Sequence, residues 1–180
     1  EIGEFDRVFL AAPQNPLGRN ELVAPAAPFL KEAAGIGHAV RFVDEDGIAR
    51  RVPLVHEDPH LGRVWMLGFA MAASHRGYDL NSAEINQHEI RLRDAKENQV
   101  RIPLDGRGNL IVPWKSDAGD PRTLRAQGME SVLGSAAVRA RGGKEPPAFF
   151  GDRLVLVGST GSSPVISDMG PTPIGTSTPF

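Results

Sequence analysis

The sequence contains no cysteine among its 180 residues. Because catalytic thiolates, cysteine-ligated zinc sites and iron–sulfur clusters all require cysteine sulfur, these classes of site are excluded. The lack of cysteine says little about cellular compartment, since a chain of this length buries enough surface to hold a core without disulfides.

A strong net charge is lacking too. The formal net charge is -2 at pH 7, and no long run of Lys or Arg occurs. Such a chain presents no basic field that would attract a polyanion. We therefore expect no nucleic-acid partner.

No hydrophobic run is long enough to cross a membrane. The longest strongly apolar stretch, VWMLGFAMAA (residues 64–73), is about half of the roughly 20 residues that a membrane-spanning helix needs. The sequence starts at Glu1 instead of Met and stops at TSTPF after a Pro-rich run. We therefore expect it to be a part of a longer protein.

The first third of the sequence alternates between strand and helix patterns. RVFLAA (residues 7–12) predicts a strand, and PFLKEAAG (28–35) predicts a helix that ends at Gly35. HAVRFVDEDGIARRVPLV (38–55) places two apolar runs on either side of the turn residues DEDG. This pattern predicts a β-hairpin.

The rest of the sequence continues the mixture. RVWMLGFAMAASHRG (63–77) predicts a largely buried helix, and apolar runs separated by Asp-Gly and Gly-Asn pairs predict a sheet meander over residues 89–114. RTLRAQGMESVLGSAAVRARGG (122–143) predicts a second long helix, and DRLVLVG (152–158) a buried strand. We predict one α/β (or α+β) domain over residues 1–180, with a mixed β-sheet and flanking helices.

HEDPH (residues 56–60) contains the His-Glu-x-x-His pattern of zinc proteases. That motif binds zinc when a helix brings both histidines to one face. Pro59 would lie inside this helix, where it lacks an N–H group and costs about 3 kcal/mol. The other histidines are scattered and supply no obvious third ligand. We predict a solvated loop and no metal site.

VLVGSTGSSP (residues 155–164) is the strongest enzyme-like pattern, because a strand followed by a Gly-rich loop and a helix cradles phosphate groups. The spacing Gly158-x-x-Gly161 matches neither dinucleotide nor P-loop fingerprints, and prolines follow where the helix should begin. We interpret Gly158 as a turn after a buried strand and expect no cofactor. A nucleotide-binding or hydrolytic enzyme that uses the Gly158–Gly161 loop stays open as an alternative.

Three stretches together resemble the second CHASE family of extracellular sensory domains, which are associated with bacterial cyclases, histidine kinases and serine/threonine kinases. They are AAGIGHAVRFVDEDGIARRVPLV (33–55), IPLDGRGNLIVPW (102–114) and FFGDRLVLVGSTGSSPVISDMGPTP (149–173). The resemblance begins without the family's usual N-terminal portion. Positions of its motif fall on Asp46, Gly47, Arg50, Gly158, Asp168, Thr172 and Pro173, which become the candidate binding or structural residues.

The resemblance implies a non-catalytic, extracytoplasmic (periplasmic or extracellular) sensory domain of a bacterial transmembrane receptor in the inner membrane. Flanking membrane segments outside this chain would connect it to a cytoplasmic cyclase, kinase or similar output domain. Its partner would be a small molecule or environmental signal of unknown identity, and a homodimer is an open expectation. A structural spacer that binds nothing is a further alternative.

Arg50 interrupts an apolar row if IARRVPLV (residues 48–55) is a strand, because alternation places it with Ile48, Val52 and Leu54. A guanidinium keeps its charge, so a buried Arg50 requires a carboxylate partner. Asp46 and Asp168 are the candidates, and together they would fasten the closing loop to the hairpin. The alternative is that Arg50 extends into water.

Overall fold

The computed structural model describes residues 7–18, 20–40, 42–113, 128–143, 154–158, 171–172 and 175–176. Within these residues, short strands and helices form several small sheets, so the predicted α+β class is confirmed. One of the strand pairs is parallel and the others are antiparallel, which makes the strand pairing mixed.

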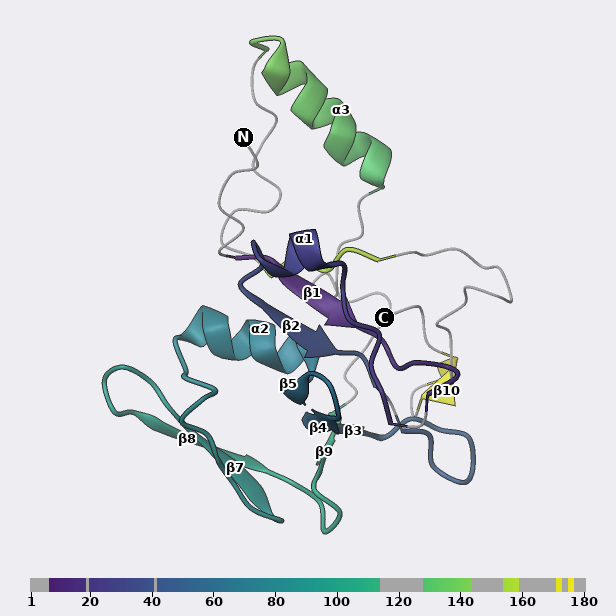
Figure 1. The fold of residues 1–180 in the computed structure, drawn as a ribbon, viewed down its shortest axis with the longest axis vertical. Helices are drawn as coiled ribbons and strands as arrows, with labels where there is room; N and C mark the ends of the chain where they lie inside the picture. Colours follow the sequence, from purple (N-terminus) through teal and green to yellow (C-terminus); the bar gives the residue numbers. More distant parts are fainter. Residues whose placement is uncertain are drawn as a thin grey trace.

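The parallel pair consists of β1 (Phe9–Ala12) and β2 (Gly35–His38) (Figure 1). An isolated bridge from His38 to Met66 joins β2 to the end of β5 (Gly62–Trp65), and β5 pairs antiparallel with β4 (Val55–Asp58). The strands β1, β2, β5 and β4 therefore lie side by side in that order and come close to forming one mixed sheet. Ala12, Leu22, Val40 and Val64 form the apolar cluster of this region.

The strand predicted at residues 7–12 is confirmed as β1, but the helix predicted at residues 28–35 is much shorter. Helix α1 (Ala27–Leu30) is about one turn with Pro28 in it, and Gly35 begins β2 instead of ending the helix. The backbone N–H of Ala34 donates to the carbonyl of Val8 at 2.9 Å. This bond holds the chain alongside β1. The backbone is therefore extended at the end of the segment where a helix was expected.

Helix α2 (Leu67–Arg76) confirms the predicted buried helix, although β5 takes the beginning of that segment. It ends where Gly77 adopts a left-handed conformation with φ of 73°, which glycine reaches without a steric penalty. Figure 1 shows α2 between the β1–β2 pair and the β7–β8 hairpin. Ala70 and Ala73 are the residues that α2 buries.

Gly37 sets how closely α2 approaches β2. A Cβ atom at Gly37 would lie 2.4 Å from the Cα of Leu67 and 2.8 Å from its backbone nitrogen. Backbone atoms cannot rotate away as a flexible side chain does, so only a residue without Cβ fits. The first turn of α2 therefore packs directly on the β2 backbone.

A second sheet contains β6 (Glu84–Ile85), β7 (Glu89–Arg93) and β8 (Gln99–Pro103), all antiparallel. The alternating sequence of β7 buries Ile90 and Leu92 against Leu54 and Ala73, which is the second apolar cluster. The predicted meander is correct for β7 and β8. It is wrong for β9 (Asn109–Ile111), which leaves β8 and pairs antiparallel with β3 (Arg51–Pro53).

The predicted hairpin over residues 38–55 is correct at its turn and wrong in its strands. The N–H of Gly47 donates to the carbonyl of Asp44 at 2.8 Å, and φ of Gly47 is 80°. The flanking residues do not pair with each other as strands, because β3 begins only at Arg51 and takes β9 as its partner.

Helix α3 (Met129–Ala140) confirms the helix predicted over residues 122–143, of which residues 122–127 lie outside the described part of the chain. The two short strands β10 (Pro171–Thr172) and β11 (Gly175–Thr176) pair antiparallel. No helix in the described ranges has the length and apolar character needed to cross a membrane.

The buried strand predicted at residues 152–158 is not found in its described part. Residues 154–158 have no regular secondary structure. The side chains there are exposed, from 39% at Val155 to 78% at Val157. This apolar run pairs with no strand among the described residues, and pairing and burial, not β propensity alone, stabilise strands.

Candidate functional site

Two turns that are distant in the sequence meet beside the β3–β9 pair. Pairing of Arg51 with Ile111 and of Pro53 with Asn109 places the turn at residues 44–47 near the turn at residues 105–108. Each turn is closed by an aspartate side chain. In the first turn, the carboxylate of Asp46 accepts the N–H of Ile48 at 3.1 Å. Short aspartate side chains followed by glycine favour such turns.

Asp105 closes the second turn. One of its carboxylate oxygens, Oδ1, accepts the N–H groups of Arg107 and Asn109, both at 2.8 Å. The side-chain amide of Asn109 adds a contact at 3.5 Å. Gly108 has a φ of 81° there, a conformation that glycine adopts freely.

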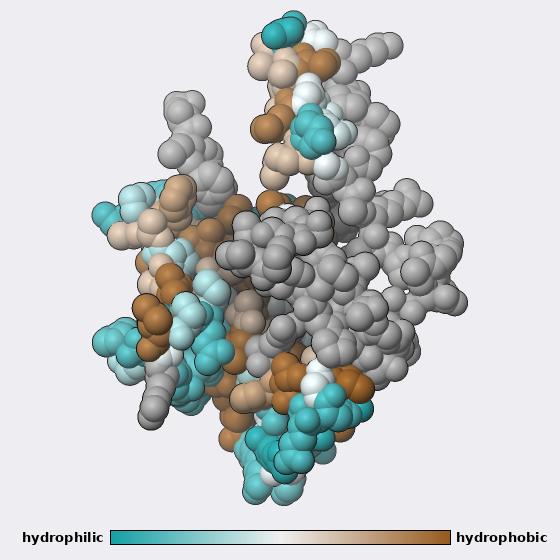
Figure 2. All heavy atoms as spheres, turned by 90° about the vertical axis from the view of Figure 1, so that its right-hand side faces the viewer, coloured by the Kyte–Doolittle hydropathy of each residue, from teal (hydrophilic) through white to brown (hydrophobic). Residues whose placement is uncertain are grey.

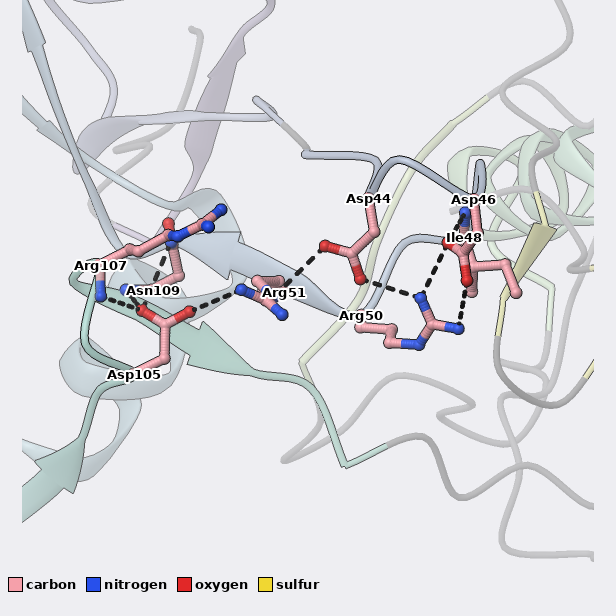
Figure 3. Close-up of polar contacts among 8 residues, drawn as sticks. All are labelled: Asp44, Asp46, Ile48, Arg50, Arg51, Asp105, Arg107 and Asn109. Atoms are coloured by element: carbon pink, nitrogen blue, oxygen red, sulfur yellow. Dashed lines mark hydrogen bonds and ion pairs between the residues drawn. The ribbon is translucent and has the colours of Figure 1, made fainter.

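Side chains of alternating charge connect the two turns through a series of ion pairs, and we call this set the ion-pair ladder (Figure 3). Arg50 holds both carboxylate oxygens of Asp46, at 2.9 and 2.7 Å, and also contacts Asp44 at 3.0 Å. Arg51 contacts Asp44 at 3.4 Å and Asp105 at 3.3 Å. The ladder therefore runs from Asp46 through Arg50, Asp44 and Arg51 to Asp105.

The ladder fixes the charges of its members. The hydrogen bond from Arg50, together with the N–H of Ile48, lowers the pKa of Asp46 to about 2. The N–H of Asn109, helped by that of Arg107 and opposed by burial, holds the pKa of Asp105 below its usual range. Neither carboxylate therefore changes its charge near neutral pH, so neither is tuned to act as a general acid or base there. The ladder is suited to binding and to holding the turns together.

A hollow of about 720 Å³ opens beside the ladder, and we call it the charged hollow. Its lining contains Phe42, Val43, Asp44, Glu45, Asp46, Arg50, Arg51, Arg107 and Asn109. Phe42 and Val43 are each 50% exposed. In Figure 2, strongly hydrophilic residues lie directly beside apolar ones at the lower end of the visible face. Charged groups and apolar surface are thus available to the same ligand.

The structure brings three of the seven candidate residues together and leaves the others apart or undescribed. Asp46 and Gly47 lie in the turn at one end of the ladder, and Arg50 lies just after that turn and contacts Asp46. Gly158 ends the exposed segment 154–158, and Thr172 lies in β10. The remaining candidates, Asp168 and Pro173, lie outside the described residues.

Arg50 has one of the two partners proposed from the sequence. Its side chain is 38% exposed, which fits the alternative that Arg50 extends into water better than burial in an apolar row. Arg50 lies in the irregular segment before β3, so the strand alternation that would have aligned it with Val52 and Leu54 does not apply to it. The proposed contact with Asp168 involves a residue outside the described part of the chain.

Among the polar contributors to the site, sequence reasoning missed Asp44, Glu45, Arg51, Asp105, Arg107 and Asn109. A signal for them exists, because DEDG and DGRGN are both turn sequences rich in Asp, Gly and Asn. The sequence gives no sign that the two turns meet, since this depends on the pairing of β3 with β9.

The HEDPH segment forms a β-hairpin, with β4 containing His56 and a turn at Pro59. The expected solvated loop is wrong for its polar residues. His56 is only 8% exposed with its Nε2 3.1 Å from the carbonyl of Asn20, and Asp58 is 5% exposed. The helix that zinc binding requires is replaced by a strand and a turn. No group of three or more His, Asp or Glu suited to a metal ion occurs in the residues that the structure describes.

The carboxylate of Asp58 can be buried because backbone N–H groups surround it and donate to it. Its carboxylate accepts the N–H of Leu22 at 2.6 Å, of Leu61 at 2.7 Å and of His60 at 2.8 Å. Burial alone raises the pKa of Asp58, but these donors more than offset it, and the pKa lies below its usual range. Asp58 thus fastens the loop at Leu22 to the β4–β5 hairpin.

His38 is fully buried at the end of β2, with its ring centroid 5.7 Å from that of His56. The N–H of Val40 donates to its Nδ1 at 3.2 Å, so the proton of the neutral ring is on Nε2. Nε2 has no hydrogen-bond partner among the described residues. Burial, followed by the neighbouring His56, lowers the pKa of His38 to about 4.

The Gly158–Gly161 loop shows no feature of a phosphate site in its described part. The preceding residues 154–157 form no strand, although a phosphate cradle of this kind begins at the end of one. Residues 159–161 lie outside the described ranges.

Comparison with known proteins agrees with the resemblance seen in the sequence. The model of the CHASE2 domain matches residues 3–180, which is nearly the whole chain. No curated protein and no solved structure matches the chain significantly. CHASE2 is a family of extracellular sensory domains without catalytic activity. On this match, the chain belongs to the CHASE2 domain family.

Proposed function

We propose that the protein is the extracytoplasmic sensory domain of a bacterial transmembrane receptor in the inner membrane. In this proposal the charged hollow binds the signal molecule, and the output domain is a cytoplasmic cyclase, kinase or similar enzyme. The observation that carries the proposal is the family match over residues 3–180. The hollow adds a place where a ligand contacts two turns at once.

The ion-pair ladder supplies a physical route for the signal. A ligand changes a receptor only if it binds two arrangements of the protein with different affinity. Arg51 contacts both Asp44 of one turn and Asp105 of the other. A ligand that competes for this guanidinium favours an arrangement in which the two turns separate. Such a separation is what we propose the receptor transmits.

Membrane topology tests the receptor part of the proposal. In the full-length protein we expect apolar segments of about 20 residues on the flanks of the domain. Reporter enzymes that are active only outside the cytoplasm, fused at the exposed Arg107 turn, should be active. An active cytoplasmic reporter at the same position would overturn the proposed location.

Output measurements test the role of the ladder. Arg51→Ala removes the ion pairs that connect the two turns. We therefore expect the full-length receptor to change its basal output activity. Arg63→Ala is the matched control, because it removes an exposed ion pair with Glu57 on the β4–β5 hairpin, outside the hollow. Equal output from both variants and the parent contradicts the ladder as the signalling element. Sedimentation of the same proteins checks the expected homodimer.

A further inference from the structure

Given the proposed sensory role of the charged hollow, its walls favour one class of ligand. Two of its three arginines are already engaged. Arg50 holds Asp46 with two bonds and contacts Asp44, and Arg51 is shared between Asp44 and Asp105. A ligand that needed these guanidinium groups would first have to displace a carboxylate of the protein.

Arg107 differs from the other two arginines. Its backbone N–H donates to Asp105, which holds the turn, while its side chain lines the hollow. In the described part of the chain, its guanidinium forms no hydrogen bond or ion pair with a side chain. A guanidinium offers a planar set of N–H donors that matches a carboxylate, and it stays charged at every physiological pH. Arg107 therefore presents one binding position for one anionic group.

The hollow also has an apolar wall. Phe42 and Val43 line it, and half of each side chain is exposed. Ligand sites combine apolar lining with a few polar groups that fix orientation. An apolar ligand body on Phe42 and Val43 would remove both side chains from water, and this burial stabilises the complex.

Acidic residues in the lining limit the charge of the ligand. Asp44, Glu45 and Asp46 surround the same hollow as Arg107. Arg50 and Arg51 balance the charges of Asp44 and Asp46, so Glu45 faces a single remaining cation and disfavours a second anionic group, as in dicarboxylates and inorganic polyanions.

We propose that the charged hollow binds a small organic monocarboxylate, with its carboxylate on Arg107 and its apolar body on Phe42 and Val43. The proposal deepens the proposed function by naming the chemical class of the signal. It assigns recognition of the anionic group to Arg107 and recognition of the apolar body to Phe42.

Calorimetric titration of the 180-residue chain with phenylacetate tests the proposal. Benzylamine, which keeps the ring and inverts the charge, and sulfate, which lacks the apolar body, are the comparison ligands. We expect saturable binding of phenylacetate and at least tenfold weaker binding of the other two. Arg107→Gln should weaken phenylacetate binding at least about tenfold, since it removes a charge-assisted bond.

The variants separate a specific site from general charge attraction. Arg107 is exposed, so its substitution leaves the core intact. Arg101→Gln removes the same charge from the exposed face of strand β8, outside the hollow, and should leave the affinity unchanged. Phe42→Ser should weaken phenylacetate binding and leave sulfate binding unaffected. Arg107→Lys keeps the charge but loses the two-bond geometry, and should restore only part of the affinity.

Three results would overturn the proposal: no saturable binding of phenylacetate up to ~10 mM, equal affinity of the parent and Arg107→Gln, or equal affinity for phenylacetate and sulfate. None of these results contradicts the receptor proposal, because topology and basal output are measured without a ligand. Conversely, a cytoplasmic location would remove the receptor role and leave the ligand class standing.

Discussion

Arg50 and Asp46 form a bidentate ion pair, with nitrogen–oxygen distances of 2.9 and 2.7 Å. Their side chains are 38% and 51% exposed. The geometry is specific, but water and ions reach both partners, so the attraction is screened. The pair therefore orders the turn at residues 44–47 more than it stabilises the fold.

Replacement of Arg50 by alanine should change stability little and should change the ionisation of Asp46. We expect a melting temperature within about 4 °C of the parent, because exposed ion pairs contribute little. The pKa of Asp46, about 2 in the parent, should rise toward its usual value near 4. Carboxyl NMR titration measures it. A large loss of stability, or an unchanged pKa, contradicts this account.

Replacement of Asp58 by asparagine should lower the melting temperature at neutral pH, because an amide accepts fewer bonds and places N–H groups against N–H donors. The folded-state pKa of Asp58 is lowered, so its contribution is present above the unfolded pKa of about 4 and is lost as pH falls through the folded value. The difference between parent and Asp58→Asn should therefore narrow in acid. Thermal melts from pH 7 to pH 2 measure this, and a constant difference contradicts it.

His38 should make stability depend on pH in a mildly acidic range. Its folded-state pKa is lowered from 6.5 to about 4, so the unfolded chain binds the proton first. Stability is complete above about pH 6.5 and falls as the pH drops toward 4. His38→Asn keeps an acceptor near the Val40 N–H and does not titrate, so it should flatten this slope. The exposed His88, replaced by asparagine, is the control and should leave the slope unchanged.

Gly37→Ala should destabilise the protein by about 1–3 kcal/mol, because the added Cβ overlaps the backbone of Leu67. Gly134→Ala is the control with the same chemical change. That position lies in α3 with open space around the new Cβ, so alanine should stabilise by about 0.5–1 kcal/mol. Urea unfolding of both variants gives the two free energies. Equal effects at both positions would show that α2 does not pack as described.

The protein should contain no stoichiometric zinc after dialysis, despite its HEDPH sequence. His56 lies in a strand, not in the helix that would align it with His60. Elemental analysis of the purified chain checks this. Zinc at one equivalent that disappears in a His56→Ala, His60→Ala double variant would reverse the assignment.

Features set by neighbouring residues were predictable from the sequence. The turn at residues 44–47, the end of α2 at Gly77 and the strands β1, β7 and β8 depend on turn residues and local apolar patterns. Part of the candidate site follows as well, because Asp46, Gly47 and Arg50 lie within one turn and the residues just after it.

Features set by distant contacts were not predictable in this way. Asp105 joins the ladder through Arg51, 54 residues earlier, once β3 has paired with β9. Asp58 reads as a surface charge, but it is buried by an N–H donor that lies 36 residues away, at Leu22. A single sequence indicates that strands exist, while the choice of partner depends on the packing of the whole chain.

The ion-pair ladder makes the connection between the two turns sensitive to dissolved salt. Its carboxylates and guanidinium groups are 11–51% exposed, and the contacts between its partners measure 2.7–3.4 Å. Mobile ions at physiological strength screen exposed charges over a distance of about 8 Å, so they compete most strongly at the exposed Asp46 end. Asp105, the least exposed member, keeps its contacts longest. As ionic strength rises, we therefore expect the Arg50–Asp46 contact to weaken before the Arg51–Asp105 contact.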